Sequence, residues 1–132
     1  MATARPRPLS PHLSIWRWRV HALVSITHRI TGNAMAFVAI PLFTWWLVAA
    51  ATGPEAYETF YGVARSPIGY IVGVGFTYSF FQHMLSGLRH LVMDTGAGYE
   101  LKTAKTSATA AYVGAVILTA LTWFAIYSHK GF

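Results

Sequence analysis

The sequence predicts an all-α membrane protein with three transmembrane helices, and two observations support this prediction. Of the 132 residues, 55% are hydrophobic and only 11% are charged, whereas a water-soluble domain carries charges on about a quarter of its residues. In addition, three stretches are long enough to cross the hydrocarbon core of a bilayer, which takes about 20 mostly apolar residues in a helix. We therefore expect one domain, residues 1–132, that folds in lipid.

The three expected spans cover about residues 22–51, 68–93 and 107–127. The first contains AMAFVAIPLFTWWLVAAA and includes Pro41, which is expected to kink the helix because proline removes a backbone hydrogen bond. The second contains IGYIVGVGFTYSFF, and the third is SATAAYVGAVILTALTWFAIY. Short loops are expected to connect them.

The orientation of the chain follows from its basic residues, because lysine and arginine near the ends of spans stay in the cytoplasm. Three spans put two basic groups on one side: Arg5, Arg7, Arg17 and Arg19 before the first span, and Arg89, Lys102 and Lys105 around the connection between the second and third. The N-terminal segment 1–21 is therefore expected in the cytoplasm. No secretory signal is recognised at the start of the chain, and a bacterial inner membrane is favoured over the mitochondrial one.

The first span contains the polar stretch SITHRITG near its cytoplasmic end. Ser25, His28, Arg29 and Gly32 stand at i, i+3, i+4 and i+7, which places them along one face of a helix. An arginine at this depth either extends its side chain to lipid headgroups or meets a partner. Intramembrane polar residues of this kind are candidates for function.

The second span contains a similar stripe in FFQHMLSGLRHLVMD, formed by His83, Gly87, His90 and Asp94. A deep histidine with a glycine one turn further on suits a porphyrin, because imidazole binds haem iron axially and the missing side chain leaves room for the ring. A hydrogen bond between helices is the alternative for His83. For Asp94 the alternatives are a proton relay and an ion pair at the helix end.

Several kinds of chemistry are excluded by what the sequence lacks. There is no cysteine, so disulfides, thiolate nucleophiles and cysteine-ligated iron–sulfur clusters are excluded. No glycine-rich phosphate loop, HExxH or GxSxG motif occurs. No catalytic residue and no nucleic-acid partner are predicted.

Two motifs resemble a known family. The run RPLSPHL followed by SITHRITG, and then HMLSGLRHLVMD, are similar in order and spacing to the two signatures of the cytochrome b membrane-anchor subunit of succinate dehydrogenase. The resemblance covers Arg7 to Asp94 and extends to the third span by architecture alone. It implies a three-helix bundle that is completed by a second anchor subunit.

The resemblance also implies roles for individual residues. His83 would be an axial ligand of one haem b, whose other ligand comes from the second anchor subunit, and His28 and His90 would lie near the haem propionates. Ser25 and Arg29 would line a ubiquinone site at the junction with an iron–sulfur subunit. A flavoprotein subunit would oxidise succinate, so this chain would be enzymatic only as part of succinate:quinone oxidoreductase.

Three alternatives stay open at this point. The chain could anchor a quinol:fumarate reductase, which moves the same electrons in the opposite direction. It could be a haem-free structural anchor, in which His83 and Arg29 make hydrogen bonds between helices. It could also be a small transporter that binds an anion with Arg29 and Asp94, although three spans without an inverted repeat speak against this function.

Overall fold

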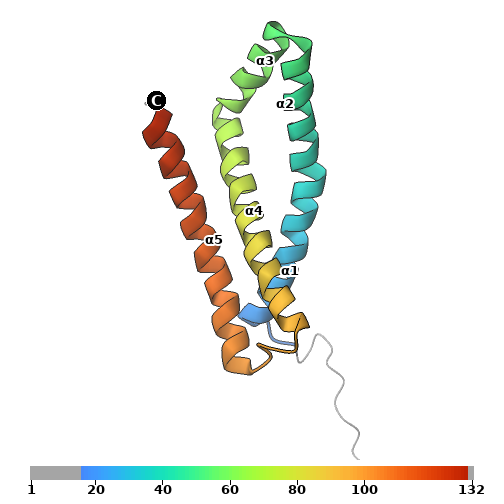
Figure 1. The fold of residues 1–132 in the computed structure, drawn as a ribbon, viewed down its shortest axis with the longest axis vertical. Helices are drawn as coiled ribbons and strands as arrows, with labels where there is room; N and C mark the ends of the chain where they lie inside the picture. The colour runs from blue at the N-terminus through green and yellow to red at the C-terminus, as the bar shows by residue number, and fades with distance from the viewer. Residues whose placement is uncertain (1–15, 131–132) are drawn as a thin grey trace, which may run out of the picture.

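The computed structural model describes residues 16–130, a range that is helical throughout its length apart from short connections (Figure 1). In chain order the elements are α1 (Val20–Ala34), the π-helix η1 (Met35–Ala39), α2 (Ile40–Thr52), α3 (Pro54–Ala64), α4 (Pro67–Asp94) and α5 (Leu101–Lys130). The RPLSPHL motif, and most of the segment 1–21 that is predicted in the cytoplasm, lie outside the described residues.

The first long helix is continuous from α1 to α2, and the expected disturbance at Pro41 takes the form of a π turn. The N–H of Ile40 bonds to the carbonyl of Met35, five residues earlier, and Pro41 follows in the first turn of α2. Proline has no N–H, and in an α-helix its ring clashes with the carbonyl four residues earlier. The wider turn just before Pro41 places this residue where the helix tolerates it.

A short helix, α3, stands where the sequence predicted a loop. Gly53 interrupts the chain with φ 136°, a conformation that favours glycine, and Pro54 then occupies the first turn of α3. After α3 ends, the Ser66 hydroxyl accepts a hydrogen bond from the Gly69 N–H at 3.1 Å and caps α4. Figure 1 shows α3 closing the end of the molecule between α2 and α4.

Two helices in the described range are long and apolar enough to be candidate spans, Val20–Thr52 and Leu101–His129. Helix α4 has 28 residues, which makes it about 42 Å long at 1.5 Å per residue and long enough to cross a bilayer. Helix α4 is less apolar than these two helices, because its second half contains polar residues such as Gln82, His83 and Arg89. A transmembrane position of α4 therefore stays a prediction.

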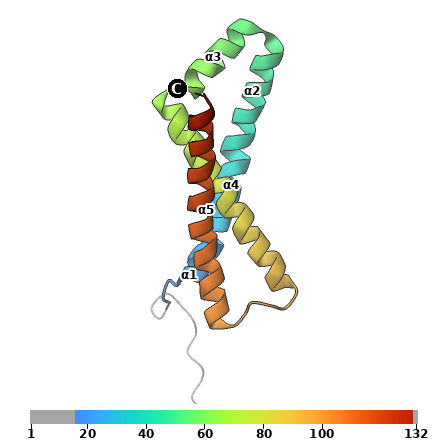
Figure 2. The same ribbon diagram turned by 60° about the vertical axis from the view of Figure 1, so that its left-hand side comes forward.

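The helices pack most closely at one end of the molecule. There α1, the second half of α4 and the first half of α5 surround a core of Val24, Ala108 and Ala111, with Leu85 and Tyr112 packed against it. Helix α4 crosses α5 at an angle (Figure 2). At this end Arg89 Nε donates a hydrogen bond to Ser107 Oγ at 3.0 Å.

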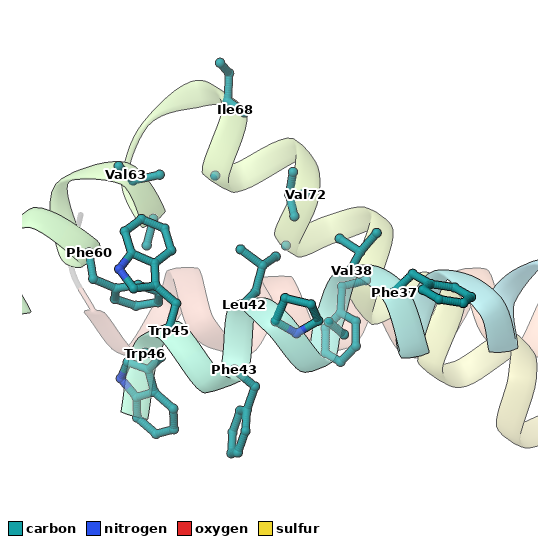
Figure 3. Close-up of a pocket in the computed structure, with 16 residues that line it drawn as sticks. Phe37, Val38, Leu42, Phe43, Trp45, Trp46, Phe60, Val63, Ile68 and Val72 are labelled. Atoms are coloured by element: carbon teal, nitrogen blue, oxygen red, sulfur yellow. The ribbon is translucent and has the colours of Figure 1, made fainter. Parts of the chain in front are cut away.

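At the other end α2 and α4 diverge and leave an apolar groove of about 680 Å³. Its walls come from η1, α2, α3 and the first half of α4, and they include Trp45, Phe60 and Val72 (Figure 3). No residue that lines the groove has an ionisable side chain. The polar residues predicted to be functional all lie at the opposite, closely packed end.

Candidate functional site

The two polar stripes of the sequence meet where α1 crosses α4. The imidazole rings of His28 and His83 stack with centroids 3.8 Å apart and an angle of 12° between their planes. The ring of His90 lies edge-on to His28, with centroids 5.2 Å apart. We call these three residues the histidine cluster. The three residues belong to two separate helices, and the resemblance of the sequence motifs predicted that they form one site. The structure brings them together.

The hydrogen bond of His83 determines which of its ring nitrogens carries the proton. Nδ1 of His83 lies 2.9 Å from the backbone carbonyl oxygen of His28, and a carbonyl oxygen can only accept. We therefore assign the proton to Nδ1, which leaves Nε2 with a free lone pair. Metal-bound histidines are commonly held by this bond from their other nitrogen to a carbonyl.

His28 is held by a serine of the neighbouring helix. Its Nδ1 lies 2.7 Å from Ser86 Oγ, and Ser86 is completely buried. Thr31, which is also buried, lies one turn further along α1 and places its hydroxyl 3.4 Å from Nδ1 of His83. Sequence reasoning missed Ser86 and Thr31. Their only signal was their position three residues after a histidine, which puts them on the same helix face.

The glycine that makes room for the His83 ring is Gly32 of α1. A Cβ atom at Gly32 would lie 2.8 Å from Cε1 of His83, too close for a real contact. Gly87, which the sequence predicted to leave room for a porphyrin, lies next to the ring of His28, whose Cε1 would be 3.6 Å from an added Cβ. The close approach of α1 and α4 at the cluster therefore depends on Gly32.

Ser25 and Arg29 lie on either side of His28 on α1, and they differ from each other in exposure. The Ser25 side chain is half-buried, whereas Arg29 is exposed. Neither side chain forms a hydrogen bond or ion pair with the described residues. His28 and Gly32 face α4, so the stripe predicted on α1 is shared between the helix interface and the surface. The Arg29 guanidinium is available to a ligand, a lipid or another chain.

Asp94 is the last residue of α4 and is exposed. Its carboxylate forms no ion pair with the described residues, so the ion pair that was one of the two alternatives for Asp94 is not formed within this part of the chain. Another buried polar residue, Gln82, precedes His83, and neither polar atom of its side-chain amide has a hydrogen-bond partner among residues 16–130. Sequence reasoning did not single it out.

The geometry restricts how the cluster could hold a metal. In the described range, no three histidine or acidic side chains are grouped closely enough to hold an ion by themselves. The parallel stack of His28 and His83 also prevents these two rings from binding one metal from opposite sides, since imidazole lone pairs lie in the ring plane and here the planes are side by side. The chemistry that fits is a single imidazole, that of His83, for a metal centre whose remaining ligands come from elsewhere.

Comparison with known proteins agrees with the resemblance of the two motifs. Residues 3–122 match the family described as succinate dehydrogenase/fumarate reductase transmembrane subunit. The succinate dehydrogenase cytochrome b556 subunit of Paracoccus denitrificans is 46% identical over 116 residues, which are 88% of this chain and 88% of the relative.

More distant relatives carry similar names. The cytochrome b556 subunit of Rickettsia conorii is 36% identical over 118 residues, 89% of this chain and 90% of the relative. The mitochondrial succinate dehydrogenase cytochrome b560 subunit of Sus scrofa is 33% identical over 97 residues, 70% of this chain and 55% of the relative. The chain belongs to the family of succinate dehydrogenase/fumarate reductase transmembrane subunits, among the cytochrome b subunits of succinate dehydrogenase.

Proposed function

We propose that this membrane subunit binds one haem b together with a second anchor subunit and forms part of the site at which ubiquinone is reduced. The observation that carries the proposal is the bond from His83 Nδ1–H to the His28 carbonyl, at 2.9 Å. This bond orients the ring and leaves Nε2 free, as an axial ligand requires. The cytochrome b names of the relatives support the same cofactor.

The haem would be held by His83, with His28 and His90 beside it at the propionates. A propionate is an anion, and an imidazole can donate a hydrogen bond to it. The second axial ligand is assigned to the partner anchor subunit, since the parallel stack removes His28 as a ligand opposite His83. When bound, the haem supplies a one-electron redox centre.

The quinone site is assigned to Ser25 and Arg29. Quinone oxygens gain negative charge as they are reduced, and a hydroxyl and a permanent cation that are already in place stabilise that charge. The exposed guanidinium of Arg29 has no partner in the described range, which leaves it able to serve in this way. Asp94, exposed at the end of α4, is assigned as the relay for the protons that the quinol takes up.

The partners follow from the same assignment. Electrons would arrive from an iron–sulfur subunit, which receives them from a flavoprotein subunit that oxidises succinate. This chain would not oxidise succinate itself. Helix α4 would be the second of three spans, because its polar half faces the bundle rather than lipid. The membrane would be a bacterial inner membrane, with the N-terminus of the chain in the cytoplasm.

The test is the reduced-minus-oxidised optical spectrum of the purified membrane complex carrying His83→Ala. The wild-type complex is expected to show a b-type spectrum that the variant loses. His129→Ala provides the control, because His129 is exposed on α5 and should leave the spectrum unchanged. Equal spectra of wild type and His83→Ala would refute the assignment of the ligand.

One specific observation favours a second reading, that of a haem-free structural anchor. The bond from His83 to the His28 carbonyl joins α4 to α1, so it also stabilises the bundle without any cofactor. This alternative predicts a wild-type complex without a b-type spectrum.

A further inference from the structure

We propose that Ser86 is a positioning residue for the haem ligand, because its hydroxyl fixes the ring of His28 and that ring fixes the plane of the His83 imidazole. The proposal rests on the proposed function, in which His83 binds haem iron. It concerns a contact two steps away from the metal, on a residue for which the motifs gave no role.

The contacts of the Ser86 hydroxyl indicate whether it donates to His28 or accepts from it. Its Oγ lies 2.6 Å from the backbone carbonyl of Gln82, one turn earlier on α4, and 3.2 Å from the carbonyl of His83. A hydroxyl has one proton, and the carbonyls can only accept it. We assign this proton to the carbonyl of Gln82, the shortest of the three contacts, so that Ser86 Oγ accepts from Nδ1–H of His28 at 2.7 Å.

This bond holds the His28 ring against rotation. Ser86 is completely buried and its own hydroxyl is tied to α4, so the acceptor for His28 is fixed in position. A buried serine with both functions used has little freedom, because any rotation of its side chain would break one bond or the other. The His28 ring is thereby locked from α4, although His28 itself belongs to α1.

His28 contacts His83 in two ways. Its backbone carbonyl accepts the His83 Nδ1–H at 2.9 Å, and its ring covers one face of the His83 ring at 3.8 Å. Gly32 lies against the Cε1 edge of the same ring. The bond at Nδ1 fixes the tautomer of His83, and the stacked ring restricts rotation of its plane about that bond. Ser86 thus acts on His83 through the ring of His28.

The effect should appear in properties that depend on ligand orientation. Outer hydrogen-bond partners of metal-binding histidines typically change metal affinity by about 10- to 100-fold when they are removed. Ser86 acts through one further residue, so the lower end, about tenfold, is expected for the rate of haem loss. The g values of the oxidised haem in electron paramagnetic resonance depend on the planes of the axial imidazoles and should shift.

The experiment compares three variants in the complete membrane complex. Ser86→Ala removes the hydroxyl, Ser86→Cys keeps the volume with a much weaker hydrogen bond, and Ser86→Thr keeps the hydroxyl. The matched control is Ser128→Ala, since Ser128 on α5 also bonds to a carbonyl of its own helix, that of Ala125, but is exposed and remote from the histidine cluster. Haem loss to added apomyoglobin and the g values are measured for each.

The expected result is a shifted signal and about tenfold faster haem loss in the Ala and Cys variants, with wild-type behaviour of the Thr and Ser128→Ala proteins. Wild-type g values and haem loss in Ser86→Ala would overturn the proposal. Equal changes in the Ala and Thr variants, or loss of the assembled complex in both Ala and Cys, would overturn it by showing a role in packing only. A wild-type complex without haem would overturn the proposed function as well, whereas a haem that survives Ser86→Ala unchanged refutes only the role of Ser86.

Discussion

Replacing Gly32 by alanine should displace the imidazole that we assign to the iron. The added Cβ would stand 2.8 Å from Cε1 and 3.3 Å from Nδ1 of His83, whereas carbon atoms in contact are separated by about 3.5–4.0 Å. The ring must therefore move by roughly 0.7–1.2 Å on the same scale. Because the ring is the end of a side chain, it will move before the backbone of either helix does.

The displacement breaks the bond that orients the ring. The bond from His83 Nδ1 to the His28 carbonyl is 2.9 Å long, and a lengthening by about 0.7 Å would take it beyond the range of a real hydrogen bond. The lost bond costs about 1 kcal/mol, and overpacking typically costs about 1–3 kcal/mol. Haem content should fall by tenfold or more, since each ~1.4 kcal/mol is a factor of ten in an equilibrium constant.

The assay is the ratio of haem to protein in the purified complex, measured together with its melting temperature. Gly75→Ala is the matched control, because Gly75 is also within a long helix, α4, and an added Cβ there meets nothing within 4 Å. The control should keep its haem. Full haem content and wild-type stability of Gly32→Ala would refute the reasoning that the close contact at Gly32 positions His83.

Three further predictions concern other polar residues. Arg29→Gln should lower succinate-to-ubiquinone electron transfer by about a hundredfold, the typical effect of removing one group that stabilises developing charge. Reduction of a soluble dye by succinate should continue. Lys102→Gln is the control, and equal loss of both activities in Arg29→Gln would contradict the quinone assignment. Gln82→Leu should raise the stability of the complex by about 1–3 kcal/mol in a thermal melt, because both polar atoms of the Gln82 amide are buried without a partner among the described residues. A lower melting temperature would mean that the amide forms a hydrogen bond in the complex. Arg89→Ala should speed hydrogen exchange in the first turns of α5, because its bond to Ser107 joins α4 to α5; unchanged exchange there would show that the bond contributes nothing to this contact.

The long helices could be predicted from the sequence because their cause is local. Apolar runs of sufficient length predicted spans at about residues 22–51, 68–93 and 107–127, and the helices of the structure enclose all of them. Helix α3 was missed, since its apolar residues form no run and its start depends on the conformation of Gly53. The kink expected at Pro41 became a π turn, which depends on backbone geometry and not on residue type alone.

The site could be predicted as a set of residues but not as an arrangement. Both stripes were visible from their helical spacing, and the structure brings His28, His83 and His90 together as one cluster. Which face of each helix meets the other depends on how α1 and α4 cross, and no local pattern determines this. For the same reason the contact of Gly32 with His83 was not predicted, and the buried Ser86 was overlooked.

The divergence of α2 from α4 has a mechanical consequence for the bundle. Helix α2 buries a single residue, Ala49, while the opposite end is tied together by hydrogen bonds among α1, α4 and α5. Regions with few buried contacts deform at little cost, and bilayers of different thickness require a spanning protein to tilt or bend. The loosely packed end, which α3 closes, can therefore tilt or bend when the bilayer thickness changes. The histidine cluster would then keep its geometry while the membrane around it thins or thickens.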